Sequence, residues 1–172
     1  FGLDPVGAGL LGSVGLLGML FGALLGGRLA DRFGRKAGVG YSLFLAGLGS
    51  LLTALAPSLS WVFLFRFLTG LGLGAELPVA ASLMGEFSPK AHRGRMVVLL
   101  EAFWAVGWLL AALVGYLLVP SLGWRAAFLA GALPALYAAY LRLSLPESPR
   151  WLVARGRAAE AEALVASWER AF

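Results

Sequence analysis

Three ionisable side chains lie deep inside long apolar stretches of this 172-residue chain, at Arg66, Glu76 and Glu101. A charge near the centre of a bilayer costs about +2.5 to +3.5 kcal/mol on insertion scales, and such residues usually mark an ion or substrate pathway. Trp104 and Trp108 follow Glu101 and stand one helical turn apart, so they offer flat faces to a ring. We predict that these five residues line a pathway for a small molecule and protons. The alternative is that the charges form structural pairs between helices and that the tryptophans only pack.

A second set of charges lies in the short polar segments between the apolar stretches. In the first segment, Asp31 stands between two glycines and precedes a basic pair. An acid at one helix end, a glycine turn and a basic pair can form a charge cluster that breaks and reforms between conformations. Basic residues alone would be simple membrane anchors, but Asp31 and its glycines favour the cluster. The predicted network contains Asp31, Arg32, Arg35, Lys36, Glu86, Arg93, Glu147 and Arg150.

The composition excludes several classes of protein. Hydrophobic residues make up 60% of the chain and charged residues 13%, whereas a soluble domain has roughly a quarter charged residues. The chain has no cysteine, its single histidine, His92, lies in a basic segment, and no Ser/His/Asp set is evident. We therefore predict no enzyme activity, no cofactor and no metal site. The net charge is +5, but the basic residues flank apolar runs rather than forming a stripe. This arrangement argues against a nucleic-acid partner.

Five apolar stretches reach the length of about 20 residues that a membrane helix needs. They are residues 6–29, 37–56, 60–85, 96–119 and 124–145. The fold class is therefore an all-α membrane protein, with residues 1–145 as its membrane domain. The basic residues fall on one side of the spans, apart from Arg66 and Arg125, and the positive-inside rule makes that side cytoplasmic.

Two further patterns concern packing. Gly15, Gly18, Gly22 and Gly26 form one small-residue face, and such a face lets membrane helices approach closely. Gly70, Gly72 and Gly74 superficially resemble a dinucleotide loop, but that motif requires a preceding strand in a βαβ unit. Residues 146–172 are polar and contain helical spacing of apolar residues, which predicts a cytoplasmic linker with an amphipathic helix at 157–172.

The segment Gly27-Arg28-Leu29-Ala30-Asp31-Arg32-Phe33-Gly34-Arg35-Lys36 resembles the signature between the second and third helices of the major facilitator superfamily. Residues 86–95 are similar to the family's loop between helices 4 and 5. The run Pro146-Glu147-Ser148-Pro149-Arg150 resembles the motif that follows helix 6 in sugar porters. The resemblance implies that the visible spans are helices 2–6 of twelve, so helix 1 and the carboxy-terminal half would be missing partners. It also implies that the charge network favours one access state.

One departure from the sugar-porter pattern concerns the substrate. Sugar porters follow their helix 4 glycines with P-x-Y-x-x-E, but Pro78 here is followed by neither the tyrosine nor the glutamate. The segments that contain Glu76 and Glu101 look more like the corresponding segments of bacterial niacin and aromatic-acid symporters. The resemblance therefore implies a secondary transporter in a bacterial inner membrane, moving a small niacin-like or carboxylated aromatic nutrient with protons. A sugar–proton symporter is the alternative within the family, and a half-length structural or assembly membrane protein is the alternative outside it.

Overall fold

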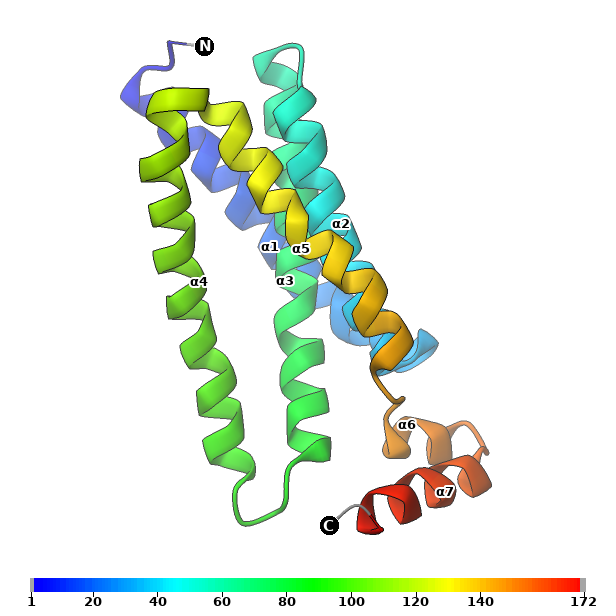
Figure 1. Ribbon diagram of the computed structural model, residues 1–172. Coiled ribbons are helices and arrows are strands. Elements are labelled where there is room, and N and C mark those ends of the chain that lie inside the picture. The colour runs from blue at the N-terminus through cyan, green and yellow to red at the C-terminus, as the bar shows by residue number, and fades with distance from the viewer. Residues whose placement is uncertain (1, 171–172) are drawn as a thin grey trace.

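The computed structural model describes residues 2–170, with the side chains at positions 134, 138, 139 and 141–143 excluded. Within this described part every regular element is a helix, which confirms the predicted fold class. The helices are α1 (Pro5–Phe33), α2 (Arg35–Leu55), α3 (Leu59–Phe87), α4 (Arg93–Leu122), α5 (Trp124–Ser144), α6 (Pro149–Ala154) and α7 (Ala158–Glu169). Five long helices run up and down, and α6 and α7 lie across one end of them (Figure 1).

Four of the long helices, α1 to α4, are long and apolar enough to cross a membrane. The fifth, α5, has 21 residues, but six of its side chains lie outside the described residues, so the fifth span stays a prediction. Helix α4 continues through Pro120 to Leu122 rather than stopping before the proline. Gly123, which has a φ of 79°, ends it by donating from its amide to the carbonyl of Val119. The link between α4 and α5 is therefore a single residue.

The linker after residue 145 contains two helices where the sequence predicted one. Ser148 starts α6 by accepting a hydrogen bond from the Trp151 amide at 3.1 Å. Gly156, with a φ of 75°, then makes the turn that separates α6 from α7. The ring of Trp168 on α7 meets that of Phe87 at the end of α3, with centroids 5.2 Å apart. This contact holds the linker beneath the bundle, and the last predicted residues, 171–172, lie outside the described part.

Helix α3 is the centre of the bundle, and glycine allows α1 to lie directly against it. A β-carbon on Gly18 or Gly22 would come within 3.0 Å of the α3 backbone at positions 67 to 75. The same holds in reverse for Gly70 and Gly74, whose β-carbons would meet the α1 backbone. Gly72 points the other way, toward α2 at Ala46. The three alternating glycines of α3 therefore serve close helix packing on two sides.

Helices α2 and α5 form a second close pair. The Ser50 hydroxyl donates to the carbonyl of Phe128 on α5 at 2.8 Å. At the same end, Arg125 donates to the carbonyls of Ala54 and Ala56 at 3.1 Å and 3.2 Å. These carbonyls end α2 and have no partner within that helix. Arg125, which did not fit the one-sided charge pattern, is therefore explained as a capping residue.

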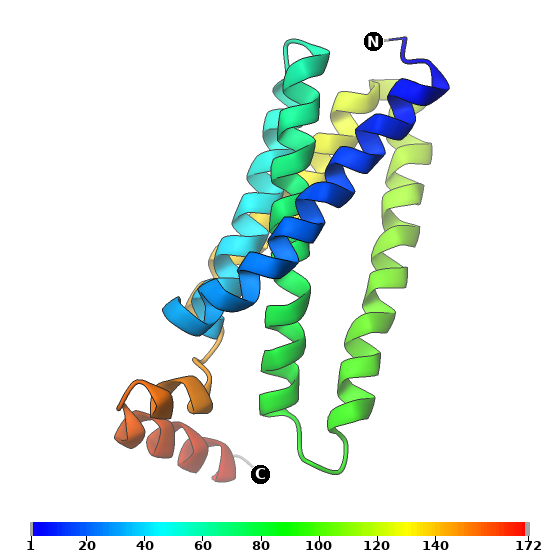
Figure 2. The same ribbon diagram turned by 180° about the vertical axis from the view of Figure 1, so that it is seen from behind.

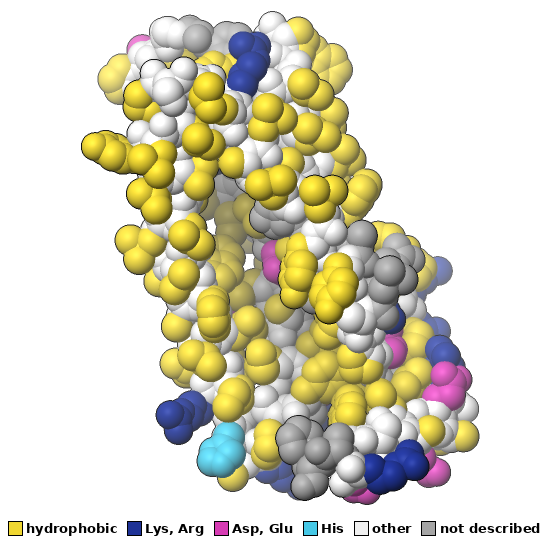
Figure 3. Space-filling view, in the orientation of Figure 1, with side chains coloured by type: hydrophobic (Ala, Val, Ile, Leu, Met, Phe, Trp, Pro, Cys, Tyr) yellow, Lys and Arg dark blue, Asp and Glu magenta, His cyan; other side chains and the backbone are white. Residues whose placement is uncertain are grey.

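None of the residues of helix α4 is buried. It joins α3 through the loop at residues 88–92 and α5 through Gly123, and its middle stands apart from the bundle in both ribbon views (Figures 1 and 2). The space-filling view shows a hollow along the inner side of this helix (Figure 3). The hollow matters because α4 carries three of the five residues predicted to line a pathway.

Candidate functional site

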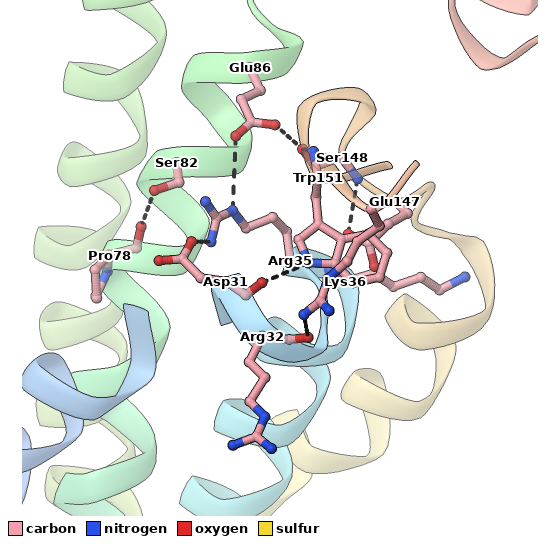
Figure 4. Close-up of polar contacts among 11 residues, drawn as sticks. Asp31, Arg32, Arg35, Lys36, Pro78, Ser82, Glu86, Glu147, Ser148 and Trp151 are labelled. Atoms are coloured by element: carbon pink, nitrogen blue, oxygen red, sulfur yellow. Dashed lines mark hydrogen bonds and ion pairs between the residues drawn. The ribbon is translucent and has the colours of Figure 1, made fainter. Parts of the chain in front are cut away.

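The structure places part of the predicted charge network in one cluster, where the ends of α1, α2 and α3 meet the linker (Figure 4). Arg35, the first residue of α2, pairs with Asp31 one turn earlier on α1. Its Nε lies 3.9 Å from the Glu86 carboxylate at the end of α3. Glu86 is only 10% exposed and accepts a hydrogen bond from the buried Ser148 hydroxyl. Arg35 and Glu86 therefore connect three spans and the linker.

Glu147 caps a helix to which it is not adjacent in sequence. Its Oε1 accepts hydrogen bonds from the amides of Lys36 at 3.1 Å and Ser148 at 3.0 Å. Gly34, the residue before α2, has no side chain to fill this role. A carboxylate at a helix N-terminus contributes about 0.3–1 kcal/mol when exposed and up to about 2 kcal/mol when partly buried. Glu147 therefore attaches the linker to α2.

Gly34 is required at this junction for two reasons. Its φ of 106° lies in a region that L side chains rarely adopt. A β-carbon would also enter the space that the Glu147 carboxylate occupies. The sharp turn between α1 and α2 and the capping by Glu147 therefore depend on the same glycine.

Two linker residues join the cluster although the sequence did not predict them. The Trp151 indole donates to the Asp31 carbonyl at 2.9 Å. Arg155 donates to the carbonyl of Arg32, so the C-terminal end of α1 has two donors from the linker. Their position just after the Pro146–Arg150 motif was the available signal, but only the structure shows which carbonyls they reach.

In the described part of the chain, four basic side chains of the predicted network form no ion pair in the cluster, namely Arg32, Lys36, Arg93 and Arg150. Lys36 takes part only through its backbone amide. Arg93 forms no ion pair there, and its buried Nε has no hydrogen-bond partner. Arg150 is exposed on α6 beside a groove between α6 and α7. The guanidinium of Arg32 points away from the cluster (Figure 4) and lies 5.6 Å from the centroid of the Phe33 ring. Among the described residues, the charged network is therefore smaller than the eight residues predicted.

A cavity of about 410 Å³ lies between α1, α3 and α4, and it brings together three of the five predicted pathway residues. Arg66 of α3 lies in one wall, and Trp104 and Trp108 of α4 lie in another. Gly12, Gly15, Leu16, Met19, Thr69, Gly70 and Leu73 complete the lining. The volume is in the usual range of pockets for small ligands, roughly 300–1,000 Å³.

The cation in this cavity is not neutralised by a neighbouring acid. Arg66 is half-buried, and its guanidinium carbon lies 5.6 Å from the centroid of the Phe128 ring. None of the described acidic residues is within ion-pair distance of it. A guanidinium binds a carboxylate through two parallel hydrogen bonds, and an indole face stacks on a flat ring. The cavity therefore combines an anion-binding group with two aromatic surfaces.

Glu76 and Glu101, the other two predicted pathway residues, are absent from the lining of this cavity. Glu76 is half-buried on α3, and Glu101 is exposed on α4, one turn before Trp104. Their side chains form no ion pair with Arg66.

The comparisons with known proteins agree with this architecture. The sequence matches the family described as "Sugar (and other) transporter" over residues 5–171. It is 48% identical, over 98% of the chain, to the niacin transporter NiaP of Acinetobacter baylyi. It is 40% identical, over 93% of the chain, to the 4-hydroxybenzoate transporter PcaK of Pseudomonas aeruginosa. The chain spans only 38% and 36% of the length of these two relatives.

Two solved structures of a transporter are also similar to this chain. The xylose transporter XylE of E. coli, in a partially occluded inward-open conformation, matches 94% of the chain with a TM-score of 0.83 and 27% identity. The match covers 43% of that protein. A second structure, described as a proton:xylose symporter of the major facilitator superfamily, matches with the same score and identity. These matches and the apolar helices identify a multi-pass integral membrane protein, and the chain belongs to the sugar (and other) transporter family of the major facilitator superfamily.

Proposed function

We propose that the complete protein is a secondary transporter that imports a small carboxylated aromatic nutrient, such as nicotinate, together with protons. The observation that carries this proposal is the cavity in which Arg66 faces the same space as Trp104 and Trp108. Arg66 would bind the carboxylate, and one or both indoles would stack on the ring. The relatives named for niacin and 4-hydroxybenzoate transport support the same class, because both substrates are carboxylated aromatic rings.

Proton coupling is the second part of the proposal. Glu76 and Glu101 are acidic residues within the membrane spans α3 and α4, where ionisable groups usually serve a transport function. Because neither acid is tied to Arg66, each is available to bind and release a proton as the protein changes conformation. The proton symport named for the xylose transporter is consistent with this mechanism.

The proposed partners are the parts of the protein outside this chain. Helix α4 lacks buried residues, so a preceding helix 1 would cover its inner face and close the cavity. Arg93 and Arg150, which have no acid partner in the described residues, would pair with the carboxy-terminal half. We place the basic loops in the cytoplasm and the protein in a bacterial inner membrane, following the positive-inside rule.

A sugar is the second candidate substrate, because the solved relatives are xylose transporters of 27% identity. The cavity favours the carboxylate, since a neutral sugar would leave the Arg66 charge unpaired. Family membership also favours transport over a purely structural role for the complete protein.

Uptake into proteoliposomes of the full-length protein tests the function. Labelled nicotinate, benzoate and xylose are compared with and without an imposed proton gradient, and protein-free liposomes serve as the control. We expect saturable nicotinate or benzoate uptake that the gradient drives above equilibrium. Saturable xylose uptake without either acid would refute the substrate proposal, and accumulation that ignores the gradient would refute proton coupling.

A further inference from the structure

A second cavity, of about 350 Å³ and lined mainly by apolar residues, lies between α1 and α2. The joined ends of these two helices lie on the opposite side of α3 from α4 (Figure 2). The two helices meet at Gly34 and diverge from it, so they form a V whose floor is α3. Leu29 and Phe33 line one side, Tyr41 and Leu45 line the other, and Leu71, Ala75 and Val79 form the floor. This V-shaped cavity, which we call the α1–α2 cleft, is separate from the cavity at Arg66.

The α1–α2 cleft opens to the outside of the chain and lies within one leaflet. Leu29, Phe33 and Tyr41 at its edges are about half exposed, at 51%, 54% and 53%. The lining on α1 extends from Gly26 to Phe33, which is about 10 Å at ~1.5 Å per residue. One leaflet contributes about 15 Å of hydrocarbon, half of the usual ~30 Å. The cleft therefore has the polarity and depth that an acyl chain requires.

Two cations stand near the end of this cleft where α1 and α2 meet, on the side of the basic loops. Arg32 is exposed, its guanidinium lies 5.6 Å from the centroid of the Phe33 ring, and Phe33 is itself part of the cleft. Arg28 is exposed one turn earlier on the same helix. Neither arginine forms an ion pair with any described acid. Asp31, the nearest acid in sequence, is already paired with Arg35.

We propose that the α1–α2 cleft binds an anionic phospholipid from the leaflet next to the basic loops. One acyl chain occupies the apolar cleft, and the phosphate contacts Arg32, with Arg28 adding to the positive potential. Basic residues at a membrane surface attract anionic lipids by about 1 kcal/mol each. The site is independent of the transported substrate, so this proposal does not rest on the function proposed above.

Native mass spectrometry of the detergent-solubilised full-length protein tests the site by titration with phosphatidylglycerol or phosphatidylcholine. We expect the protein to retain phosphatidylglycerol more strongly, and Arg32→Gln to lower its affinity by about fivefold. Arg95→Gln removes another exposed arginine, at the start of α4, and should leave the affinity unchanged. Leu45→Trp fills the cleft and should lower binding of both lipids. Leu29→Trp, at the half-exposed edge, provides a second test that does not alter buried packing.

Three results would overturn the proposal. Equal retention of the two lipids would show that no anionic headgroup is selected. An unchanged phosphatidylglycerol affinity in Arg32→Gln would remove the cation from the site. Unchanged lipid binding in both Leu45→Trp and Leu29→Trp would show that no acyl chain enters the cleft, including the case in which another part of the full-length protein covers it.

Discussion

The α1–α3 pair and helix α4 represent two extremes of packing in one small bundle. Along α1 and α3, glycines at Gly18, Gly22, Gly70 and Gly74 bring the backbones so close that a β-carbon would collide on either side. On α4, no residue is buried, and a β-carbon on Gly107 or Gly115 would meet nothing within 4 Å. Helices α1 and α4 are nevertheless both apolar and similar in length, with 29 residues in α1 and 30 in α4.

This difference separates helices that are packed against each other within the chain from a helix whose surface is left uncovered by the chain. Helices α1 and α3 pack closely against each other within the chain, and α3 carries Arg66. Helix α4 presents Trp104 and Trp108 to the same cavity but is held mainly at its two ends. We therefore expect substitutions at the α1–α3 contact to change stability, and substitutions of the α4 tryptophans to change ligand binding.

The largest expected effect is on stability, at the α1–α3 contact. Gly22→Ala places a methyl group within 3.0 Å of the backbone of Leu71 and Ala75, which cannot move aside as a side chain can. Overpacking of this kind costs about 1–3 kcal/mol, occasionally more. Gly27→Ala is the matched control, because its β-carbon meets nothing within 4 Å. Melting temperatures of the full-length variants in detergent measure the effect, and equal values would show that the close contact is absent.

The junction between the linker and α2 should show a smaller effect. Glu147→Ala removes the acceptor for the amides of Lys36 and Ser148. We expect a loss of about 1 kcal/mol, in keeping with an anion at a helix N-terminus. Glu162→Ala, which removes an exposed acid from α7, is the control. A Glu147→Ala protein as stable as the Glu162→Ala protein would mean that the linker does not cap α2 in solution.

A loss of affinity without a loss of stability is expected on α4. Trp104→Ala removes a stacking surface, and aromatic pairs contribute about 0.5–1.5 kcal/mol, so nicotinate affinity should fall about two- to tenfold. Trp61→Ala, at the far end of α3 and outside the cavity, should bind as the parent does. Equilibrium binding and a melting curve are measured on each variant. A Trp104→Ala protein with a lower melting temperature but an unchanged affinity for nicotinate would contradict the proposed roles of the two regions.

The smallest effect is expected for Asp31, which is 65% exposed. Exposed ion pairs contribute about 0–1 kcal/mol, so Asp31→Asn should shift the balance between access states by at most about fivefold. Transport should fall while the amount of membrane-inserted protein stays constant. Quantitative immunoblots of membranes provide the control, and unchanged transport kinetics would reduce Asp31 to a surface anchor.

Much of the fold could be predicted from the sequence, because membrane helices are defined by local apolar length. The glycine face of α1 was also predictable from its spacing. Its partner was not, because the period of one helix does not specify which neighbour it contacts. Gly70 and Gly74 therefore gained their role only when α3 was placed against α1.

The candidate site was predicted less completely. Arg66, Trp104 and Trp108 share a cavity, whereas Glu76 and Glu101 are not in its lining. Glu101 shares the helical face of Trp104 and Trp108, so its depth along α4 sets it apart. Glu147 reaches α2 across 111 residues of sequence, a distance over which no local pattern operates. Arg93 was expected in the charge cluster because residues 86–95 resemble a loop of the family, but it pairs with none of the described acids.

The most direct test of the account is the affinity of the full-length protein for nicotinate when Arg66 is changed. Arg66→Gln keeps polarity but removes the cation, and a hydrogen bond to a charged group contributes about 1.5–3 kcal/mol. We predict at least a tenfold loss of affinity, a partial recovery in Arg66→Lys, and no loss in Arg125→Gln, which removes an arginine that caps α2 instead. Unchanged affinity in Arg66→Gln would show that the cavity between α1, α3 and α4 is not where the carboxylate binds.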